Sequence, residues 1–265
     1  MTSGPQADIV HGAETIDMQE GNSRGILLLH GFGDTPQTLR LLAEYLHGAD
    51  YDVLAPLLPG HGRNVESFAG SRSADWTEFA REELKAMRAS HESVALAGLS
   101  MGGALAAILA AEYHDTPSLV MMAPYMDMTL THKIAAASYW LWGADTPRKS
   151  SNPGSIRDPA ERVKNVGYGA YTPRLLHELS IVAAAARRAL PRITSPALIV
   201  QSRTDPRIKP EVAEETLASL GSKEKRLVWI EGAGHIITVD YGREHVFLEV
   251  REWIDAHVSG LATTA

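Results

Sequence analysis

A serine between two glycines ends a run of apolar residues near the middle of the chain. The segment reads Gly98-Leu99-Ser100-Met101-Gly102, it follows the apolar residues 94–97, and an alanine-rich stretch comes after it. A serine at such a strand-to-helix turn stands exposed at a helix N-terminus, where free N–H groups favour negative charge. Ser100 is therefore the candidate nucleophile of an acyl-transfer reaction.

Two further polar residues come directly after predicted strands. Asp205 lies in the loop after 197–201, and His235 lies in the loop after 226–230. Because the carboxyl ends of parallel strands meet at one edge of a sheet, we expect both side chains to gather at the serine. The chain order serine, acid, histidine is typical of a triad on such a sheet, with His235 as general base and Asp205 as the acid that orients it. Asp127, shortly after another predicted strand, is the alternative acid.

An oxyanion formed at the serine needs N–H donors nearby. Met101 follows the nucleophile directly, and Phe32 lies in the glycine-rich loop after the apolar run 25–29. The backbone N–H groups of these two residues are the predicted oxyanion hole. His30 and His61 lie in neighbouring loops, and we interpret both as structural residues that hold their loops by hydrogen bonds.

Strands and helices alternate through most of the chain, which predicts an α/β protein with a doubly wound, mainly parallel sheet. Continuous apolar runs predict buried strands, and helical periodicity with proline or glycine at the ends predicts helices between them. Asp75 is the expected N-cap of one helix, with Glu78 completing a capping box. The expected strands are 14–18, 25–29, 51–56, 93–99, 119–124, 197–201 and 226–230, and the expected helices are 36–47, 76–89, 101–113, 175–190, 210–220 and 243–258.

Residues 125–190 interrupt this alternation with aromatic residues, prolines and glycines. A segment of this length is too long for a connecting loop in a compact fold. It predicts a helical cap inserted into a single domain of residues 1–265, whose core comprises about 9–124 and 191–258. Because acyl pockets are mostly apolar, the expected lining is Phe32, Tyr125, Met126, Trp140, Trp142 and Ile236.

The composition excludes several classes of function. The 265 residues carry a formal net charge of −7 and include no cysteine, which argues against nucleic acid as a partner and excludes thiol catalysis and disulfides. No metal-ligand spacing stands out, no apolar run approaches the ~18 residues of a membrane span, and the first residues lack the pattern of a signal peptide. We expect a cytoplasmic protein, without metal or cofactor, that acts on a small molecule, with a homodimer as one option for its assembly.

The motifs resemble those of the α/β-hydrolases, in particular the bacterial carboxylesterase and monoacylglycerol lipase branch. The resemblance implies a serine carboxylic-ester hydrolase that acts on short- to medium-chain acyl esters through an acyl-enzyme on Ser100, without a cofactor. A carbon–carbon bond hydrolase, thioesterase or perhydrolase with the same triad is the alternative, followed by a non-catalytic ligand-binding protein of this fold. The matching segments are Leu28-Leu29-His30-Gly31-Phe32, Pro59-Gly60-His61-Gly62, Asp75-Trp76, Gly98-Leu99-Ser100-Met101-Gly102-Gly103, Gln201-Ser202-Arg203-Thr204-Asp205 and Gly234-His235-Ile236-Ile237-Thr238.

Overall fold

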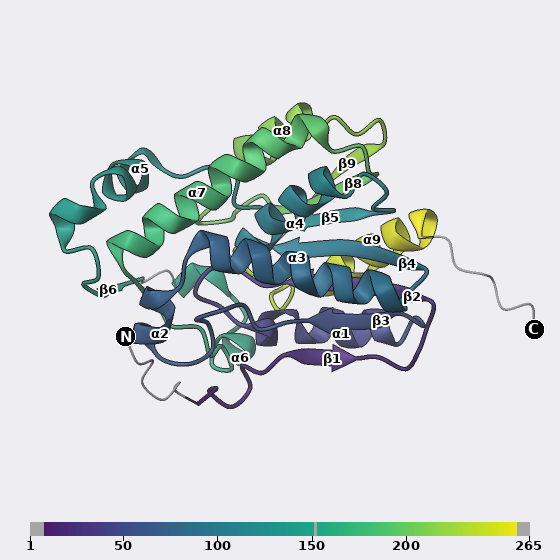
Figure 1. Ribbon diagram of the computed structural model, residues 1–265, viewed down its shortest axis with the longest axis horizontal. Helices are drawn as coiled ribbons and strands as arrows, with labels where there is room; N and C mark the ends of the chain where they lie inside the picture. Colours follow the sequence, from purple (N-terminus) through teal and green to yellow (C-terminus); the bar gives the residue numbers. More distant parts are fainter. Residues whose placement is uncertain (1–7, 151–152, 259–265) are drawn as a thin grey trace, which may run out of the picture.

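A seven-stranded sheet runs through the centre of the computed structural model, which describes residues 8–150 and 153–258 (Figure 1). The strand order is β1-β3-β2-β4-β5-β8-β9; β1 runs antiparallel to β3, and the other pairings in this sheet are parallel. The predicted doubly wound, mainly parallel sheet is confirmed. The strands are β1 (Ile16–Met18), β2 (Arg24–Leu29), β3 (Asp52–Ala55), β4 (Ser93–Leu99), β5 (Leu119–Met122), β8 (Ala197–Ser202) and β9 (Lys225–Ile230).

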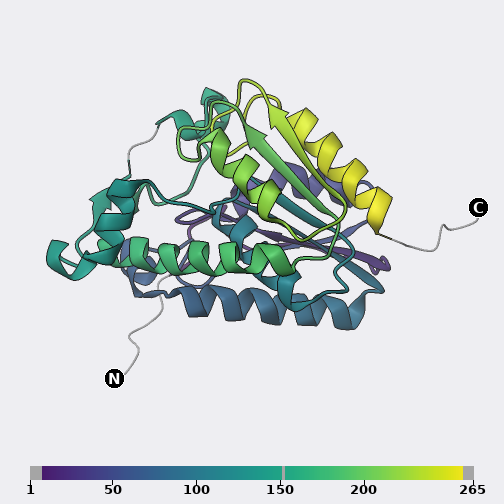
Figure 2. The ribbon, with the colours of Figure 1, turned by 90° about the horizontal axis from the view of Figure 1, so that it is seen from above.

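Helices cover both faces of the sheet (Figures 1 and 2). Along β2, Leu27 and Leu29 join the core on one face, whereas Ile26 and Leu28 join the core on the other, and all four are fully buried. Burial on both faces explains why this strand reads as a continuous apolar run. The first face is covered by α3 (Ser73–Ser90), α4 (Met101–Glu112), α7 (Pro173–Ala189) and α8 (Pro210–Ser219), and the second by α1 (Arg40–His47) and α9 (Arg243–His257).

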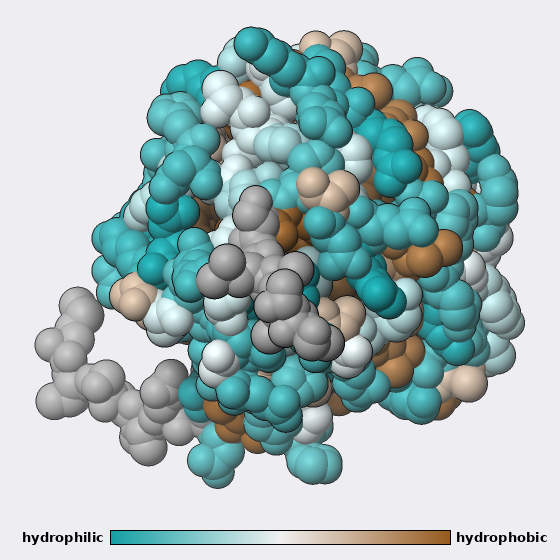
Figure 3. Space-filling view, turned by 90° about the vertical axis from the view of Figure 1, so that its right-hand side faces the viewer, coloured by the Kyte–Doolittle hydropathy of each residue, from teal (hydrophilic) through white to brown (hydrophobic). Residues whose placement is uncertain are grey.

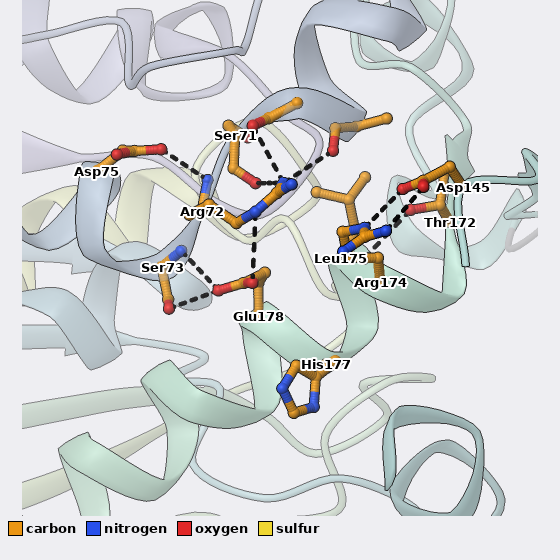
Figure 4. A network of polar contacts seen from close by, with 12 residues as sticks. Ser71, Arg72, Ser73, Asp75, Asp145, Thr172, Arg174, Leu175, His177 and Glu178 are labelled. Atoms are coloured by element: carbon orange, nitrogen blue, oxygen red, sulfur yellow. Dashed lines mark hydrogen bonds and ion pairs between the residues drawn. The ribbon is translucent and has the colours of Figure 1, made fainter. Parts of the chain in front are cut away.

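The start of α3 differs from the prediction. The helix begins at Ser73, so Asp75 occupies its third position, where its carboxylate accepts a hydrogen bond from the N–H of Arg72 (2.9 Å). The carboxylate of Glu178 accepts from both the N–H (3.0 Å) and the hydroxyl (2.6 Å) of Ser73 (Figure 4). The free N–H groups of the first turn are thus capped partly from α7, a hundred residues away, which a local pattern such as Asp75-x-x-Glu78 does not reveal.

The segment between β5 and β8 contains several short elements and one long helix. Figure 2 shows α7 lying along α3 and α4, while residues 130–149 lie beyond the end of the sheet. Its division from the core as a separate cap remains a prediction. The elements are α5 (Leu130–Ala137), the 3-10 helix η2 (Tyr139–Trp142), β6 (Arg148–Lys149), η3 (Pro153–Ser155), α6 (Pro159–Arg162), β7 (Ala170–Tyr171), α7 and η4 (Leu190–Arg192). Two further elements lie outside this segment, η1 (Pro36–Leu39) and α2 (Val65–Gly70).

The face of the molecule at the right of Figure 1 is covered mainly by hydrophilic residues, with apolar residues scattered among them (Figure 3). Among the helices in the described ranges, none combines the length and the apolar character needed to cross a lipid bilayer. On the opposite edge of the sheet, the carboxyl ends of β2, β4, β5, β8 and β9 meet, because these strands are parallel.

Candidate active site

The serine between β4 and α4 occupies a strained backbone conformation. Ser100 has φ 56° and ψ −116°, a region that residues with a side chain rarely adopt. Its N–H donates to the carbonyl oxygen of Met122 (2.8 Å), and its own carbonyl oxygen accepts from the N–H of Tyr125 (3.0 Å). The end of β5 therefore holds the turn on both sides of the serine.

Two glycines allow this turn to form. A Cβ atom at Gly98 would overlap the backbone of Gly102, and a Cβ atom at Gly102 would overlap the carbonyl group of Leu29 in the neighbouring strand. Because the obstacles are backbone atoms rather than flexible side chains, no small rearrangement makes room for a side chain. Both glycines are required by close approach of the chain.

The three side chains grouped by the sequence form one hydrogen-bonded chain. Nε2 of His235 lies 2.9 Å from Oγ of Ser100, and Nδ1 lies 2.7 Å from Oδ2 of Asp205. Because an ionised carboxylate only accepts, Nδ1–H donates to Asp205, and Nε2 is left to accept from the serine hydroxyl. The alternative acid Asp127 instead forms ion pairs with Lys133 (2.9 Å) and Arg187 (3.0 Å).

The Asp205 carboxylate is fully engaged. Oδ1 accepts from the N–H groups of Arg207 (2.7 Å) and Ile208 (3.0 Å), and Oδ2 accepts from the side-chain amide of Gln201 (2.9 Å) as well as from His235. Burial alone would raise the pKa of Asp205, but the charge and hydrogen bond of His235, with these backbone bonds, hold the pKa below its usual value. Sequence reasoning missed Gln201, whose only signal is a polar side chain inside a buried strand.

Two buried histidines hold the loops beside the serine. Nε2 of His30 accepts from the N–H of Leu58 (3.1 Å), and Nε2 of His61 accepts from the N–H of Gly33 (3.2 Å). Burial lowers the pKa of His30 to about 4, and burial together with the neighbouring His30 lowers the pKa of His61 well below its usual value. Both rings are therefore neutral at physiological pH, in agreement with the structural role that we expected.

The loop that carries Phe32 runs alongside the serine. A Cβ atom at Gly31 would lie 3.4 Å from Cβ of Ser100. The Phe32 ring packs against Phe68 and the fully buried Trp76, with ring centroids 5.0 and 6.0 Å away. This packing fixes the loop next to Ser100, and the backbone N–H groups of Phe32 and Met101 remain the predicted oxyanion donors.

A cavity of about 540 Å³ opens beside Ser100 and His235. Of the predicted pocket residues, Phe32 and Ile236 line it. Polar residues that the sequence did not single out also line it, among them Asp34, Asn165 and Arg207. Burial raises the pKa of Asp34 to about 7. Asp34 follows the predicted oxyanion loop directly, and this place in the sequence is the signal that could have identified it.

The other predicted pocket residues lie elsewhere or outside the description. Tyr125 is half-buried and packs against the core on the α4 side of the sheet, and Met126 is 1% exposed and borders a separate small cavity. Trp140, in η2, is 66% exposed. The side chain of Trp142 lies outside the described part of the structure. Within the described ranges, no three His, Asp or Glu side chains gather as a metal site would require.

Comparison with known proteins identifies the family. The family Hydrolase_4, described as serine aminopeptidase, S33, matches residues 21–241. A thermostable monoacylglycerol lipase of Bacillus sp. (strain H-257) is 30% identical over 253 residues, 95% of this chain and 98% of the relative. A carboxylesterase of Bacillus subtilis (strain 168) is 27% identical over 238 residues, 89% of this chain and 94% of the relative.

Solved structures agree with this assignment. A structure from work on the metagenome-derived lipolytic enzymes LipS and LipT superposes with a TM-score of 0.86 at 30% identity, covering 94% of this chain and all of that one. A monoacylglycerol lipase of Paleococcus ferrophilus superposes with a TM-score of 0.78 at 20% identity, covering 92% of this chain and 98% of that one, which shows the shared fold. The chain belongs to the Hydrolase_4 (serine aminopeptidase, S33) family and has the α/β-hydrolase fold.

Proposed function

We propose that this protein is a serine carboxylic-ester hydrolase that acts on short- to medium-chain acyl esters, monoacylglycerols among them. The observation that carries the proposal is the hydrogen-bonded chain from Asp205 through His235 to Ser100 at the wall of an open cavity. The names of the relatives, a monoacylglycerol lipase and a carboxylesterase that match along most of their length, support the choice of an ester bond.

In this proposal Oγ of Ser100 attacks the ester carbonyl carbon while Nε2 of His235 takes the hydroxyl proton. The oxyanion accepts hydrogen bonds from the N–H groups of Met101 and Phe32, and Asp205 stabilises the imidazolium. When the tetrahedral intermediate collapses, the carbon–oxygen bond to the alcohol breaks, and the alcohol leaves with the proton from His235. Water then attacks the acyl-enzyme with His235 again as base, which releases the acid and restores the serine.

Replacement of the nucleophile tests this assignment. We expect Ser100→Ala and His235→Ala each to lower kcat for a 4-nitrophenyl ester by about 10⁴- to 10⁶-fold, because members of a triad act as a unit. A fluorophosphonate probe should label the wild-type protein on Ser100 and leave Ser100→Ala unlabelled. Ser90→Ala, a change on an exposed helix face, is the matched control and should behave as wild type. Ester hydrolysis that survives in Ser100→Ala would contradict the proposal.

A substrate series separates the ester hydrolase from other uses of the same triad. The series comprises 4-nitrophenyl esters and monoacylglycerols of increasing chain length, acyl thioesters, ring-fission diketones and aminoacyl anilides. We expect the esters to give the highest kcat/KM. We also propose that residues 125–190 set the longest acyl chain accepted, because elements of this segment border the cavity. A clear preference for another bond would overturn the ester assignment while leaving the nucleophile intact.

A further inference from the structure

Behind the triad lies a carboxylate that the proposed mechanism does not use. Asp240 is fully buried, five residues after His235. Its Oδ2 atom accepts from the N–H groups of Gly234 (2.6 Å) and Arg157 (2.9 Å), and its Oδ1 atom accepts from those of Asp158 (2.8 Å) and Tyr241 (2.9 Å). One carboxylate therefore joins the residue just before the histidine to a segment of the 125–190 insertion.

The same segment of the insertion holds the histidine through a carbonyl group. The carbonyl oxygen of Ser155 accepts from the N–H groups of both His235 and Ile236, each at 2.9 Å. A Cβ atom at Gly234 would overlap the carbonyl oxygen of Gly154, so the two backbones approach as closely as a glycine allows. The backbone of His235 is thus fixed from outside its own loop.

The segment also reaches the loop that carries the acid. Nη2 of Arg157 donates to the carbonyl oxygen of Thr204 (2.9 Å), and Nη1 donates to that of Gly232 (3.4 Å). Nε of Arg207 donates in turn to the hydroxyl of Ser155 (2.7 Å). Residues 154–158, here called the tether, therefore contact the acid loop and the histidine loop at once.

We propose that Asp240 is a positioning residue for the reaction, which acts with the tether to set the place of the His235 ring between Ser100 and Asp205. The imidazole must lie within hydrogen-bond reach of both partners, and a displacement of about 1 Å can lower the rate on the order of 100-fold. The backbone N–H groups of His235 and Ile236 donate to the tether, and that of Gly234 donates to Asp240. Together with the bonds that the Ala233 carbonyl accepts from the hydroxyls of Ser202 and Thr204, these contacts fix the position of the histidine loop. The inference rests on the proposed function only in that His235 acts as the base.

The test compares two buried carboxylates. Asp52 is also buried and accepts from the N–H groups of Glu20, Gly21 and Asn22, but it begins β3 at the opposite edge of the sheet from the triad. Asp240→Asn and Asp52→Asn both replace acceptors by an amide and should lower Tm. At a temperature where both variants are folded, we expect Asp240→Asn to lower kcat on the order of 100-fold with KM within about 2-fold of wild type, and Asp52→Asn to leave kcat unchanged.

The rate of labelling by a fluorophosphonate is the second readout. It depends on the Ser100–His235 geometry and not on an ester substrate, so the tether can be tested even if the ester assignment fails. We expect labelling to slow in Asp240→Asn in proportion to kcat. The opposite result is a Tm lowered as in Asp52→Asn, with kcat and the labelling rate within about 3-fold of wild type. Asp240 would then have only a structural role, and the proposal would be overturned.

A surface variant covers the case in which Asp240→Asn does not fold. Arg157→Ala removes the two bonds to the triad loops, and we expect kcat to fall about 10-fold, with partial rescue in Arg157→Lys, which restores one donor. The matched control is Arg203→Ala in the same acid loop, where the guanidinium pairs with the exposed Glu231 (2.9 Å). Wild-type kcat in Arg157→Ala, or an equal loss in Arg203→Ala, would overturn the proposal.

Discussion

The core and the 125–190 insertion are held in place by different kinds of contact. The turns of the triad follow β4, β8 and β9, and the parallel ladders that link β4, β5, β8 and β9 fix how far apart these turns lie. In the insertion, α7 packs against α4, and separate hydrogen bonds from backbone groups such as the Ser155 carbonyl and from side chains join residues far apart in the sequence. The hydroxyl of Tyr168 donates to the carbonyl oxygen of Gly60 (2.9 Å), and Glu178 accepts from Ser73.

The two kinds of contact predict that the core and the insertion respond differently to single substitutions. A strand ladder is a repeated structure in which backbone atoms of neighbouring strands approach closely, so an added atom has no room. A separate side-chain bond contributes little by itself, and its loss leaves the others in place. Substitutions against the core backbone should therefore have large effects, and those at the anchors of the insertion small ones.

The largest effect is expected when a glycine of the core, rather than a glycine of the insertion, is replaced by alanine. The Cβ atom of Gly102→Ala would overlap the Leu29 carbonyl, and we expect a loss of more than about 4 kcal/mol or no folding at all. Gly169 in the insertion has φ +56° and open space around it, so Gly169→Ala should cost about 1–2 kcal/mol from backbone strain alone. Urea unfolding measures both losses of stability, and equal losses would contradict the expected difference between the two regions.

A pH-dependent effect is expected where the two regions meet. Burial is the main influence on Asp34 and raises its pKa to about 7. The N–H of Thr35, the charge of Arg207 and the hydroxyl of Thr38 oppose this effect and lower the pKa in part. Between pH 4 and 7 the Asp34 carboxyl ionises in the unfolded chain but stays protonated in the folded protein. The free energy of unfolding of the wild type therefore falls as pH rises through this range.

Asp34→Asn removes this dependence. We expect the free energy of unfolding of the variant to increase relative to that of the wild type from pH 4 to 7. Above pH 7 this difference should stay constant, at most about 4 kcal/mol. Tm measured against pH checks the slope, with Glu252→Gln on an exposed position of α9 as the control that should show no slope difference. A constant difference between Asp34→Asn and wild type would show that the carboxyl ionises in the folded protein as it does in the unfolded chain.

The smallest effects are expected at the anchors of α7 (Figure 4). Glu178→Gln weakens the bonds to Ser73 and should cost about 1–2 kcal/mol. Arg174→Gln breaks a largely exposed ion pair with Asp145 (2.6 Å) and should cost less than about 1 kcal/mol. Both variants should keep the wild-type kcat, and a fall in kcat would show that α7 contributes to the geometry of the triad.

The sequence predicted the core because its signals are local. A buried strand, a sharp glycine turn and the loop after a strand can each be read within a few residues, and parallel pairing then brings Ser100, Asp205 and His235 together. The start of α3 shifted by three residues, where the distant Glu178 caps the first turn. The start of α7 shifted by two residues, to Pro173 after the local cap Thr172.

The insertion could not be predicted to the same depth. Its short elements have weak periodicity, and their positions depend on distant partners in other loops, as for Tyr168 and Gly60, which lie 108 residues apart. Aromatic residues there suggested an apolar pocket, yet Trp140 is exposed and the cavity is lined in part by Asp34 and Arg207. An aromatic residue in an irregular segment gives no information about the direction in which it points.

The carbonyl group of Ser155 has a consequence for redesign of this protein. Because it belongs to the insertion and yet holds the backbone of His235, the insertion cannot be exchanged as an independent module. A chimera that takes residues 125–190 from a relative replaces the groups that hold the backbone of His235 as well as the residues that we propose to set the acyl-chain length. Chimeras that keep residues 154–158 of the recipient, and take the flanking stretches from the donor, separate the change in selectivity from damage to turnover.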